Sequence, residues 1–333
     1  MANSPLDDAR ELILKPVARD LEAGDRVREA LLGMGREGDF GRLGEVAAWL
    51  AEWQGRYPPR VEQPTLAMFA GSHGVLSEGI SLSKDADTMA QVEALKAGTA
   101  PLSAIGAQVG ANIRVFELAL SHPTPSIAEA AAMSDKDCAA TLAFGFEALE
   151  GQPDLLGVGV IGAGIGTAAA AVACALYGGS PDYWVRPGAG TPSDITRRRT
   201  EAVTKALTLH RGHIEDPLEA LARLGGRELA ACAGAIIAAR HQGIPVILDG
   251  FATTIAAGVV HAMNPDALQH VVAGHATGRP AHQAALERIG LQPLVELNFQ
   301  TGGGLGSATA ISVCRTACAP FLGRPQSAAG TAN

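Results

Sequence analysis

The run from residue 155 to residue 177, LLGVGVIGAGIGTAAAAVACALY, constrains the fold of this chain most. A single helix needs roughly 20 consecutive apolar residues to cross a bilayer. The turn GAGIG at 162–166 divides the run into a first part rich in valine and isoleucine and an alanine-rich second part. Each part is too short to cross a bilayer. We therefore expect a buried strand followed by a packed helix, and no membrane-spanning segment.

Four other short runs resemble the first part: 65–70 (TLAMFA), 112–118 (NIRVFEL), 244–249 (IPVILD) and 270–274 (HVVAG). Aliphatic residues at successive positions are typical of strands buried on both faces. Helical spacing of apolar residues predicts helices between them at 86–109, 135–149, 167–177, 194–210, 225–241, 253–262 and 279–289. This alternation predicts an α/β fold, with a parallel sheet flanked by helices in a Rossmann-like, three-layer arrangement.

The N-terminal part has a different pattern, because apolar and charged residues alternate at helical spacing over 7–54. We expect residues 1–60 to form a small helical subdomain with the C-terminal helix at 305–323. The α/β domain is expected over 61–304, followed by a flexible tail at 324–333. The first residues, MANSPLDDARELIL, carry acids where a signal peptide is basic, so a cytoplasmic protein is expected.

Charge and composition exclude several classes of function. The formal net charge is −8 and the densest basic run is only Arg197-Arg198-Arg199, so nucleic-acid binding is not expected. The five cysteines form no CxxC pair and are expected to be reduced and buried. His275 and His282 lack an assignable third ligand, so we expect neither a metal site nor another cofactor.

Polar and glycine-rich segments follow most of the predicted strands, at the edge where a parallel sheet binds its ligands. The turn at 162–166 precedes a helix, whose dipole and N–H groups could hold an anion. Tight packing of that helix on the sheet would explain the same glycines. The candidate substrate-binding residues in these segments are His73, Gly74, Ser81, Gln91, Gly164, Gly166, Thr167, Gly188, Gly190, Asp249, Gly250, Gly302 and Gly304.

Other motifs have competing interpretations. The string GVGVIG at 157–162 matches a dinucleotide pattern, but its first two glycines fall inside the predicted strand rather than in the turn. Arg186 precedes the glycine pair Gly188 and Gly190, which could together bind a phosphate. His73 could contact a ligand from its loop, or it could be solvated or hydrogen-bonded within the fold.

The order of these motifs resembles one enzyme family. GSHGVLSEGIS, GAGIG, WVRPGAG, the stretch 224–251, AGHATGRPAH and QTGGGLGS are together similar to the nicotinate-nucleotide:dimethylbenzimidazole phosphoribosyltransferase family of cobalamin nucleotide-loop synthesis. The resemblance covers about residues 65–320. It implies a homodimer without metal that moves the phosphoribosyl group of nicotinate mononucleotide to 5,6-dimethylbenzimidazole, with inversion at the anomeric carbon and release of nicotinate. The implied partners are therefore a nucleotide and an aromatic base.

The same resemblance indicates four missing acids. The family pattern LGEGxGA carries a glutamate that serves as the base, and Gly303 stands in its place; Gly162 replaces the glutamate of GEMGIGNTT. Ser72 replaces the acid of DHGV, and Arg279 replaces that of SAEP. The catalytic residues therefore stay unassigned, and the candidates for a substitute base are His73, Glu78, Asp249 and Glu296.

Three functions remain open from the sequence. The first is a divergent phosphoribosyltransferase with an altered acceptor or reduced activity, because the glycine-rich loops are retained. The second is a catalytically silent paralogue, which binds a nucleotide or azole or forms a heteromer with an active homologue. The third is a different enzyme on the same scaffold, such as a nucleoside hydrolase.

Overall fold

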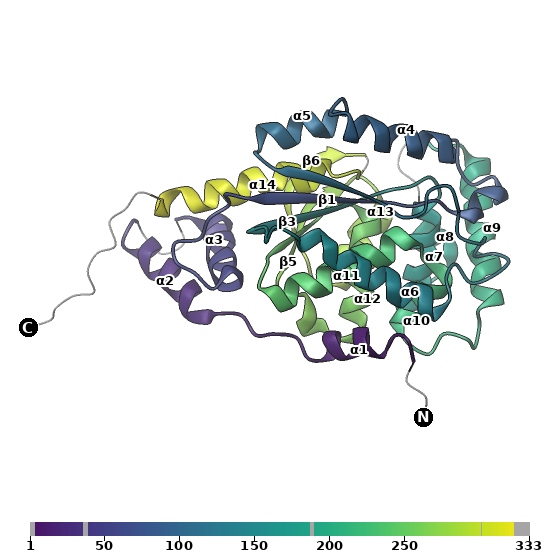
Figure 1. Cartoon of the computed structure of the whole chain (residues 1–333), viewed down its shortest axis with the longest axis horizontal. Helices are drawn as coiled ribbons and strands as arrows, with labels where there is room; N and C mark the ends of the chain where they lie inside the picture. The colour runs from purple at the N-terminus through teal and green to yellow at the C-terminus, as the bar shows by residue number, and fades with distance from the viewer. Residues whose placement is uncertain (1–3, 36–38, 187–189, 301, 323–333) are drawn as a thin grey trace, which may run out of the picture.

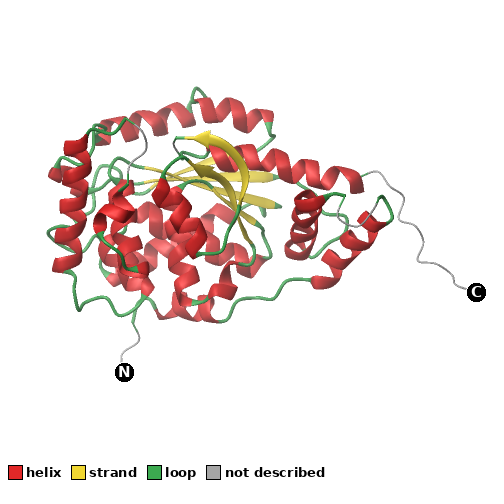
Figure 2. Ribbon diagram, turned by 180° about the vertical axis from the view of Figure 1, so that it is seen from behind, coloured by secondary structure: helices red, strands yellow, loops and turns green. Residues whose placement is uncertain are grey.

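The computed structural model describes residues 4–35, 39–186, 190–300 and 302–322. At its centre is a six-stranded sheet in the order β2-β1-β3-β4-β5-β6, in which all neighbouring strands are parallel. Helices cover both faces of this sheet, which confirms the predicted α/β class (Figures 1 and 2). The strands are β1 (Pro64–Ala70), β2 (Asn112–Glu117), β3 (Leu155–Ile161), β4 (Val246–Leu248), β5 (Val271–Thr277) and β6 (Pro293–Phe299).

Two hydrophobic cores lie on opposite faces of the sheet, because successive side chains of a strand point to opposite faces. In β1, Ala67 and Phe69 belong to one core, whereas Leu66 and Met68 belong to the other. The first core packs under α1 (Asp7–Leu14), α6 (Asp135–Phe144), α7 (Ile165–Tyr177), α8 (Pro181–Val185), α9 (Ser193–Leu209), α10 (Pro217–Leu224), α11 (Arg227–Gln242), α12 (Phe251–Met263) and α13 (Pro280–Arg288). The second packs under α2 (Leu21–Leu32), α3 (Gly41–Gln54), α4 (Asp85–Lys96), α5 (Pro101–Gln108) and α14 (Leu305–Cys318). Short 3₁₀ turns complete the fold: η1 (Gly74–Glu78), η2 (Gly145–Leu149), η3 (Pro265–Leu268) and η4 (Ala319–Phe321).

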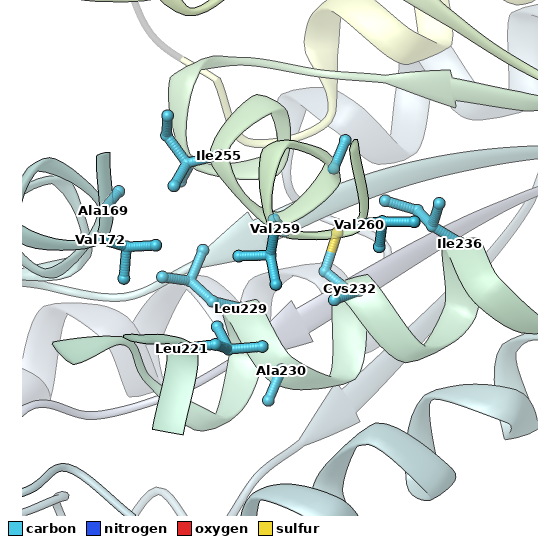
Figure 3. Close-up of a cluster of buried hydrophobic side chains, with 14 of the residues drawn as sticks. Ala169, Val172, Leu221, Leu229, Ala230, Cys232, Ile236, Ile255, Val259 and Val260 are labelled. Carbon is cyan, nitrogen blue, oxygen red and sulfur yellow. The ribbon is translucent and has the colours of Figure 1, made fainter. Parts of the chain in front are cut away.

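The run at 155–177 folds as predicted, into β3 and α7 joined by a tight turn. Gly164 occupies the N-cap of α7 with φ of +90°, a conformation that only glycine adopts readily. Aliphatic side chains of α7, α10, α11 and α12 then pack together in the first core (Figure 3). At the crossing of α6 and α11, a Cβ on Gly234 would lie 1.9 Å from the carbonyl oxygen of Leu142, so no larger residue fits there. Glycine and alanine at such positions thus allow a tightly packed scaffold.

Helices from the two ends of the chain contact each other, apart from α1, which packs on α12 in the first core. α2 packs on α3, and α3 packs on α14, at one end of the molecule (Figure 1). α14 also lies against the sheet, where it contacts β5 and β6, so it links the terminal helices to the α/β domain. The predicted tail at 324–333 lies outside the described residues. Within the described residues, no helix is long and apolar enough to cross a membrane.

Several predicted elements need correction. The helix expected at 86–109 is two helices, because Gly98 adopts φ of +73° and Pro101 begins a new helix. The helix expected at 135–149 ends at Phe144 and continues as η2. β2 is an edge strand in which only Phe116 is buried, rather than a strand buried on both faces. The sequence interpretation also missed α8, α10 and β6.

The cysteine prediction is confirmed. All five cysteines, Cys138, Cys174, Cys232, Cys314 and Cys318, are buried and free of disulfide bonds. Burial raises the pKa of the Cys138 and Cys174 thiols to about 12, so both are protonated and unreactive at neutral pH.

Candidate active site

A cavity of about 340 Å³ opens where β3, β4 and β5 end. Its walls come from the loops after these three strands, from the start of α7 and from the segment between η1 and α4. β1 lies between β2 and β3, so the order of the strands reverses beside this cavity. Parallel α/β sheets bind their ligands at such a point, outside the carboxyl ends of the strands.

The structure brings many of the predicted binding residues together. The members that line the cavity are Ser81, Gln91, Gly164, Gly166, Thr167, Asp249, Gly250 and Gly302. The members that do not line it are His73, Gly74, Gly190 and Gly304. Gly188 lies outside the described residues. Arg186, from the same predicted motif, is exposed, and its guanidinium lies 4.8 Å from the ring centre of Tyr183.

Two arginines that sequence reasoning did not propose as ligands also line the cavity, Arg199 of α9 and Arg279 at the N-cap of α13. Burial lowers the pKa of both guanidinium groups, and the charge of Arg279 lowers the pKa of Arg199 further. Within the described part of the chain, neither guanidinium is ion-paired with a carboxylate. Two partly buried positive charges without a counterion favour an anionic ligand between them.

The helical phase of α9 explains why Arg199 faces inward. Its neighbours in the basic run form ion pairs along the helix surface, Arg197 with Glu201 and Arg198 with Asp194. Arg199 instead shares the face of the buried residues Ile195, Ala202 and Val203, and its Nε donates to the carbonyl oxygen of Ile80 at 2.8 Å. This spacing of three and four residues is the sequence signal that could have identified Arg199.

The N-terminus of α7 adds a second positive feature to the cavity. Gly164, Ile165, Gly166 and Thr167 all belong to the cavity wall. The N–H of Thr167 donates to the carbonyl oxygen of Gly164 at 2.9 Å, whereas the N–H groups that precede it are of the kind that has no partner within a helix. Their partial positive charge favours an anion at this point. The helix terminus and the two arginines therefore make one end of the cavity suitable for a phosphate.

Asp249 is held by the backbone that begins α14. Its Oδ2 accepts a hydrogen bond from the N–H of Gly304 at 2.8 Å, and its Oδ1 accepts from Gly306 at 2.9 Å and Ser307 at 3.3 Å. Burial raises the pKa of the Asp249 carboxyl, against the opposing effects of the nearby His275 imidazole and these hydrogen bonds. The carboxyl group thus anchors the start of α14 beside the cavity.

His73 forms part of a buried pair behind the cavity. Its Nε2 lies 2.9 Å from Oε1 of Glu228, and both side chains are almost fully buried. Glycine neighbours provide the space, since a Cβ on Gly71 would lie 1.9 Å from Oε2 of Glu228. A Cβ on Gly164 would lie 3.3 Å from the Cβ of His73, so the pair packs directly behind the glycine-rich turn. His73 therefore supports the cavity wall from behind.

The other predicted substitute bases lie away from the cavity. Glu78 forms an ion pair with Lys205, in which the Nζ–Oε2 distance is 2.8 Å, and Glu296 is exposed on the edge strand β6. The carboxyl groups of the described lining belong to Asp87 and Asp249. Asp87 is engaged as well, because its Oδ2 accepts from the N–H of Lys84 at 2.7 Å.

Gly303 lies in the lining with φ of +81°, and a Cβ added there would meet no atom of the described residues within 4 Å. A side chain at this position has space in the cavity but a strained backbone. Gly162 is different, since its Cβ would lie 2.8 Å from the carbonyl oxygen of Gly71. The described residues hold no cluster of three or more His, Cys, Asp or Glu side chains suited to a metal ion.

Comparisons with known proteins identify relatives of this chain. A family model described as phosphoribosyltransferase matches residues 19–327. The nicotinate-nucleotide--dimethylbenzimidazole phosphoribosyltransferase of Brucella anthropi is 45% identical over 314 residues, which cover 94% of this chain and 93% of the relative. The enzyme of the same name from Sinorhizobium fredii is 46% identical over 317 residues, covering 95% and 93%.

Solved structures show the same relationship. The crystal structure of CobT from Thermus thermophilus superposes with a TM-score of 0.83 at 30% identity, and the match covers 90% of this chain and 96% of that one. These findings confirm the family inferred from the order of the motifs. The chain therefore belongs to the nicotinate-nucleotide:dimethylbenzimidazole phosphoribosyltransferase family.

Proposed function

We propose that this chain transfers the phosphoribosyl group of nicotinate mononucleotide to an aromatic azole of the dimethylbenzimidazole class. The observation that carries this proposal is the position of Arg199 and Arg279, which pair with no carboxylate among the described residues, in a cavity that also contains the N-terminus of α7. The names of the relatives supply the two substrates, and the cavity supplies the matching chemistry at one end.

The donor binds with its 5′-phosphate at the positively charged end. Arg199 and Arg279 neutralise the phosphate, and the first N–H groups of α7 donate to its oxygens. The ribose then lies along the glycine-rich walls, where Gly164, Gly250 and Gly302 allow the backbone to approach the sugar closely. This placement directs the anomeric carbon toward the rest of the cavity.

In the transfer, a nitrogen of the azole forms a bond to the anomeric carbon while the bond from that carbon to nicotinate breaks. The bonding electron pair leaves with nicotinate, whose ring nitrogen is a pyridinium in the donor and a neutral pyridine in the product. The leaving group therefore needs no proton. The azole must lose its own N–H proton to a base, either a side chain or water.

Which azole can serve as acceptor depends on how readily its N–H proton is lost to a base. Asp249 and Asp87 are engaged by backbone N–H groups, and Gly303 carries no side chain. Losing a positioned general base typically costs about 10²–10⁴-fold in rate. We therefore propose either slow transfer to dimethylbenzimidazole or faster transfer to an azole that needs no strong base.

The test is chromatography of the purified protein with nicotinate mononucleotide, with and without dimethylbenzimidazole, other azoles, purines and phenols. Nicotinate release that depends on the acceptor supports the proposal. Nicotinate and ribose 5-phosphate formed without an acceptor would instead show a hydrolase. A protein that releases no nicotinate with any of these acceptors would contradict the transferase proposal.

The second candidate is a silent paralogue that binds nucleotide without turnover. The engagement of both oxygens of Asp249 by backbone N–H groups favours it. Calorimetry separates the two proposals, because the silent paralogue binds nicotinate mononucleotide and leaves it intact for hours, whereas the transferase consumes it when an acceptor is added.

Three further sequence predictions stay proposals. They are the homodimer, the cytoplasmic location and the division into subdomains; the alternative to the homodimer is a heteromer. Light scattering of the purified chain tests the first. A mass twice the 34.1 kDa of one chain supports the homodimer, and a monomer that dimerises only with an active homologue would support the heteromer.

A further inference from the structure

His282 lies in α13 next to the cavity and is fully buried. Both of its ring nitrogens have partners. The backbone N–H of Thr277 donates to Nδ1 at 3.0 Å, and Nε2 lies 3.1 Å from Oγ1 of Thr254. Because a backbone N–H can only donate, Nδ1 is the acceptor and the neutral ring carries its proton on Nε2. Nε2 therefore donates to Thr254.

Thr254 extends this connection to the next loop. Its hydroxyl donates to the carbonyl oxygen of Gly250 at 3.0 Å. A chain of three hydrogen bonds thus runs from Thr277, at the end of β5, through His282 and Thr254 to Gly250, which follows β4. Both ends of this chain, Thr277 and Gly250, line the cavity, whereas His282 does not.

Arg279 lies inside the loop that His282 closes. The carbonyl oxygen of Arg279 accepts from the N–H of His282 at 3.0 Å, and the neighbouring Gly278 donates to the carbonyl oxygen of Phe299 at 3.1 Å. The backbone is therefore fixed on both sides of Arg279, and its guanidinium lies in the cavity wall, where no carboxylate of the described chain pairs with it.

We infer that His282 is a positioning residue for the phosphoribosyl donor: its imidazole holds Arg279 and Gly250 at the distance that the bound donor requires, without contacting the donor. This inference rests on the proposed function. Burial lowers the pKa of His282 to about 3, so the ring stays neutral and the direction of the three hydrogen bonds is constant at physiological pH.

If His282 had a purely structural role, its replacement would lower stability without changing the affinity for the donor. His270 is a matched control for this comparison. His270 is also fully buried, burial also lowers its pKa to about 3, and its Nε2 lies 2.9 Å from the carbonyl oxygen of Ile236. It precedes β5 at the opposite end of the strand from the cavity. Replacing either histidine should lower stability, but only the replacement of His282 should weaken donor binding.

The experiment compares His282→Phe with His270→Phe in the full chain. Calorimetry measures the Kd of inorganic phosphate and of nicotinate mononucleotide, steady-state kinetics measures KM and kcat, and thermal unfolding measures Tm. We expect His282→Phe to raise both Kd values and the donor KM by about tenfold to a hundredfold, with a smaller change in kcat. His270→Phe should lower Tm without changing Kd. His282→Asn, which keeps an acceptor for the Thr277 N–H, should recover part of the donor affinity.

Equal Kd values for wild type and folded His282→Phe overturn the inference, while the proposed function stands if the wild type turns over. A wild type that neither binds nor consumes nicotinate mononucleotide overturns both. If His282→Phe does not fold, Thr254→Val replaces it, because this change removes only the hydroxyl between His282 and Gly250. A folded Thr254→Val protein with weaker donor binding supports the inference, and one with unchanged Kd overturns it.

Discussion

The carboxyl group of Asp249 accepts a hydrogen bond from the N–H of Gly304 at 2.8 Å, and this contact joins the end of β4 to the start of α14. Two segments far apart in the sequence thereby form adjoining walls of the cavity. A Cβ on Gly302 would lie 2.7 Å from Oδ2 of Asp249, so glycine is needed where the two walls meet. The glycine-rich segment before α14 is therefore shaped by a buried carboxyl group, besides any contact it makes with a ligand.

Asp249→Asn should destabilise the protein. One of the N–H groups at the start of α14 would then face an amide donor in place of a carboxyl oxygen, which costs about 1–3 kcal/mol for a buried group. Chemical denaturation measures this loss. The matched control is Asp20→Asn, at the exposed N-cap of α2, where asparagine caps as well as aspartate and the change should stay below about 0.5 kcal/mol. Equal losses in the two variants would contradict the anchoring role of Asp249.

Arg199→Ala should weaken donor binding. Losing one charge-assisted hydrogen bond of about 1.5–3 kcal/mol raises the Kd or KM of nicotinate mononucleotide roughly tenfold to a hundredfold. Arg197→Ala on the same helix is the control, because Arg197 faces solvent and pairs with Glu201. Calorimetric titration compares the three proteins. Unchanged affinity in Arg199→Ala would show that the donor phosphate does not bind at this end of the cavity.

Gly303→Glu should increase transfer to dimethylbenzimidazole, since Gly303 lines the cavity and an added Cβ meets no described atom within 4 Å. The left-handed backbone at this position costs about 1–2 kcal/mol, which should appear as a lower Tm. Gly303→Gln carries the same strain without a base, so its rate should stay near that of the wild type. A variant Gly303→Glu no faster than Gly303→Gln would show that a base at this position does not limit the reaction.

Gly162→Glu, unlike Gly303→Glu, should not increase the rate of transfer. A Cβ at Gly162 would lie 2.8 Å from the carbonyl oxygen of Gly71, so the turn must shift to accept any side chain. We expect lower stability and no gain in rate, as measured by Tm and nicotinate release. A faster Gly162→Glu enzyme would show that this turn rearranges more freely than the structure indicates.

Stability should fall as the pH is lowered below about 6.5. Burial holds the pKa of His270 and of His282 at about 3, below the ordinary value of 6.5, so the unfolded chain binds more protons between these two values. Each histidine then makes the unfolding free energy decrease by up to about 1.4 kcal/mol per pH unit within this window. Denaturation between pH 7.5 and 5 should show a shallower decrease in His270→Phe than in wild type. Parallel curves would contradict the neutral, buried state of His270.

The central part of the fold could be predicted because its signals are local. The segment at 155–177 contains a strand, a glycine turn and an alanine-rich helix in direct succession, and each forms where its pattern indicates. β6 was missed because it is an edge strand whose residues, PLVELNF, carry exposed polar positions instead of a continuous apolar run. α10 was missed because it is a helix of only eight residues, Pro217–Leu224.

The candidate site could be predicted only in part. Asp249 and Gly250 line the cavity, as expected from their position directly after a strand of the parallel sheet. The engagement of Asp249 could not be foreseen, because its partners Gly304, Gly306 and Ser307 come from a distant helix. His73 also follows a strand, but its pairing with Glu228 of α11 is a tertiary contact that the local motif does not reveal.

The most direct test of this account is acceptor-dependent release of nicotinate from nicotinate mononucleotide. The account predicts that the wild type releases nicotinate and forms the phosphoribosylated azole in equal amounts, and that Arg279→Ala reduces this release at low donor concentration by roughly tenfold or more. A protein that binds nicotinate mononucleotide at the cavity but releases no nicotinate with any azole would contradict the assignment as a working phosphoribosyltransferase.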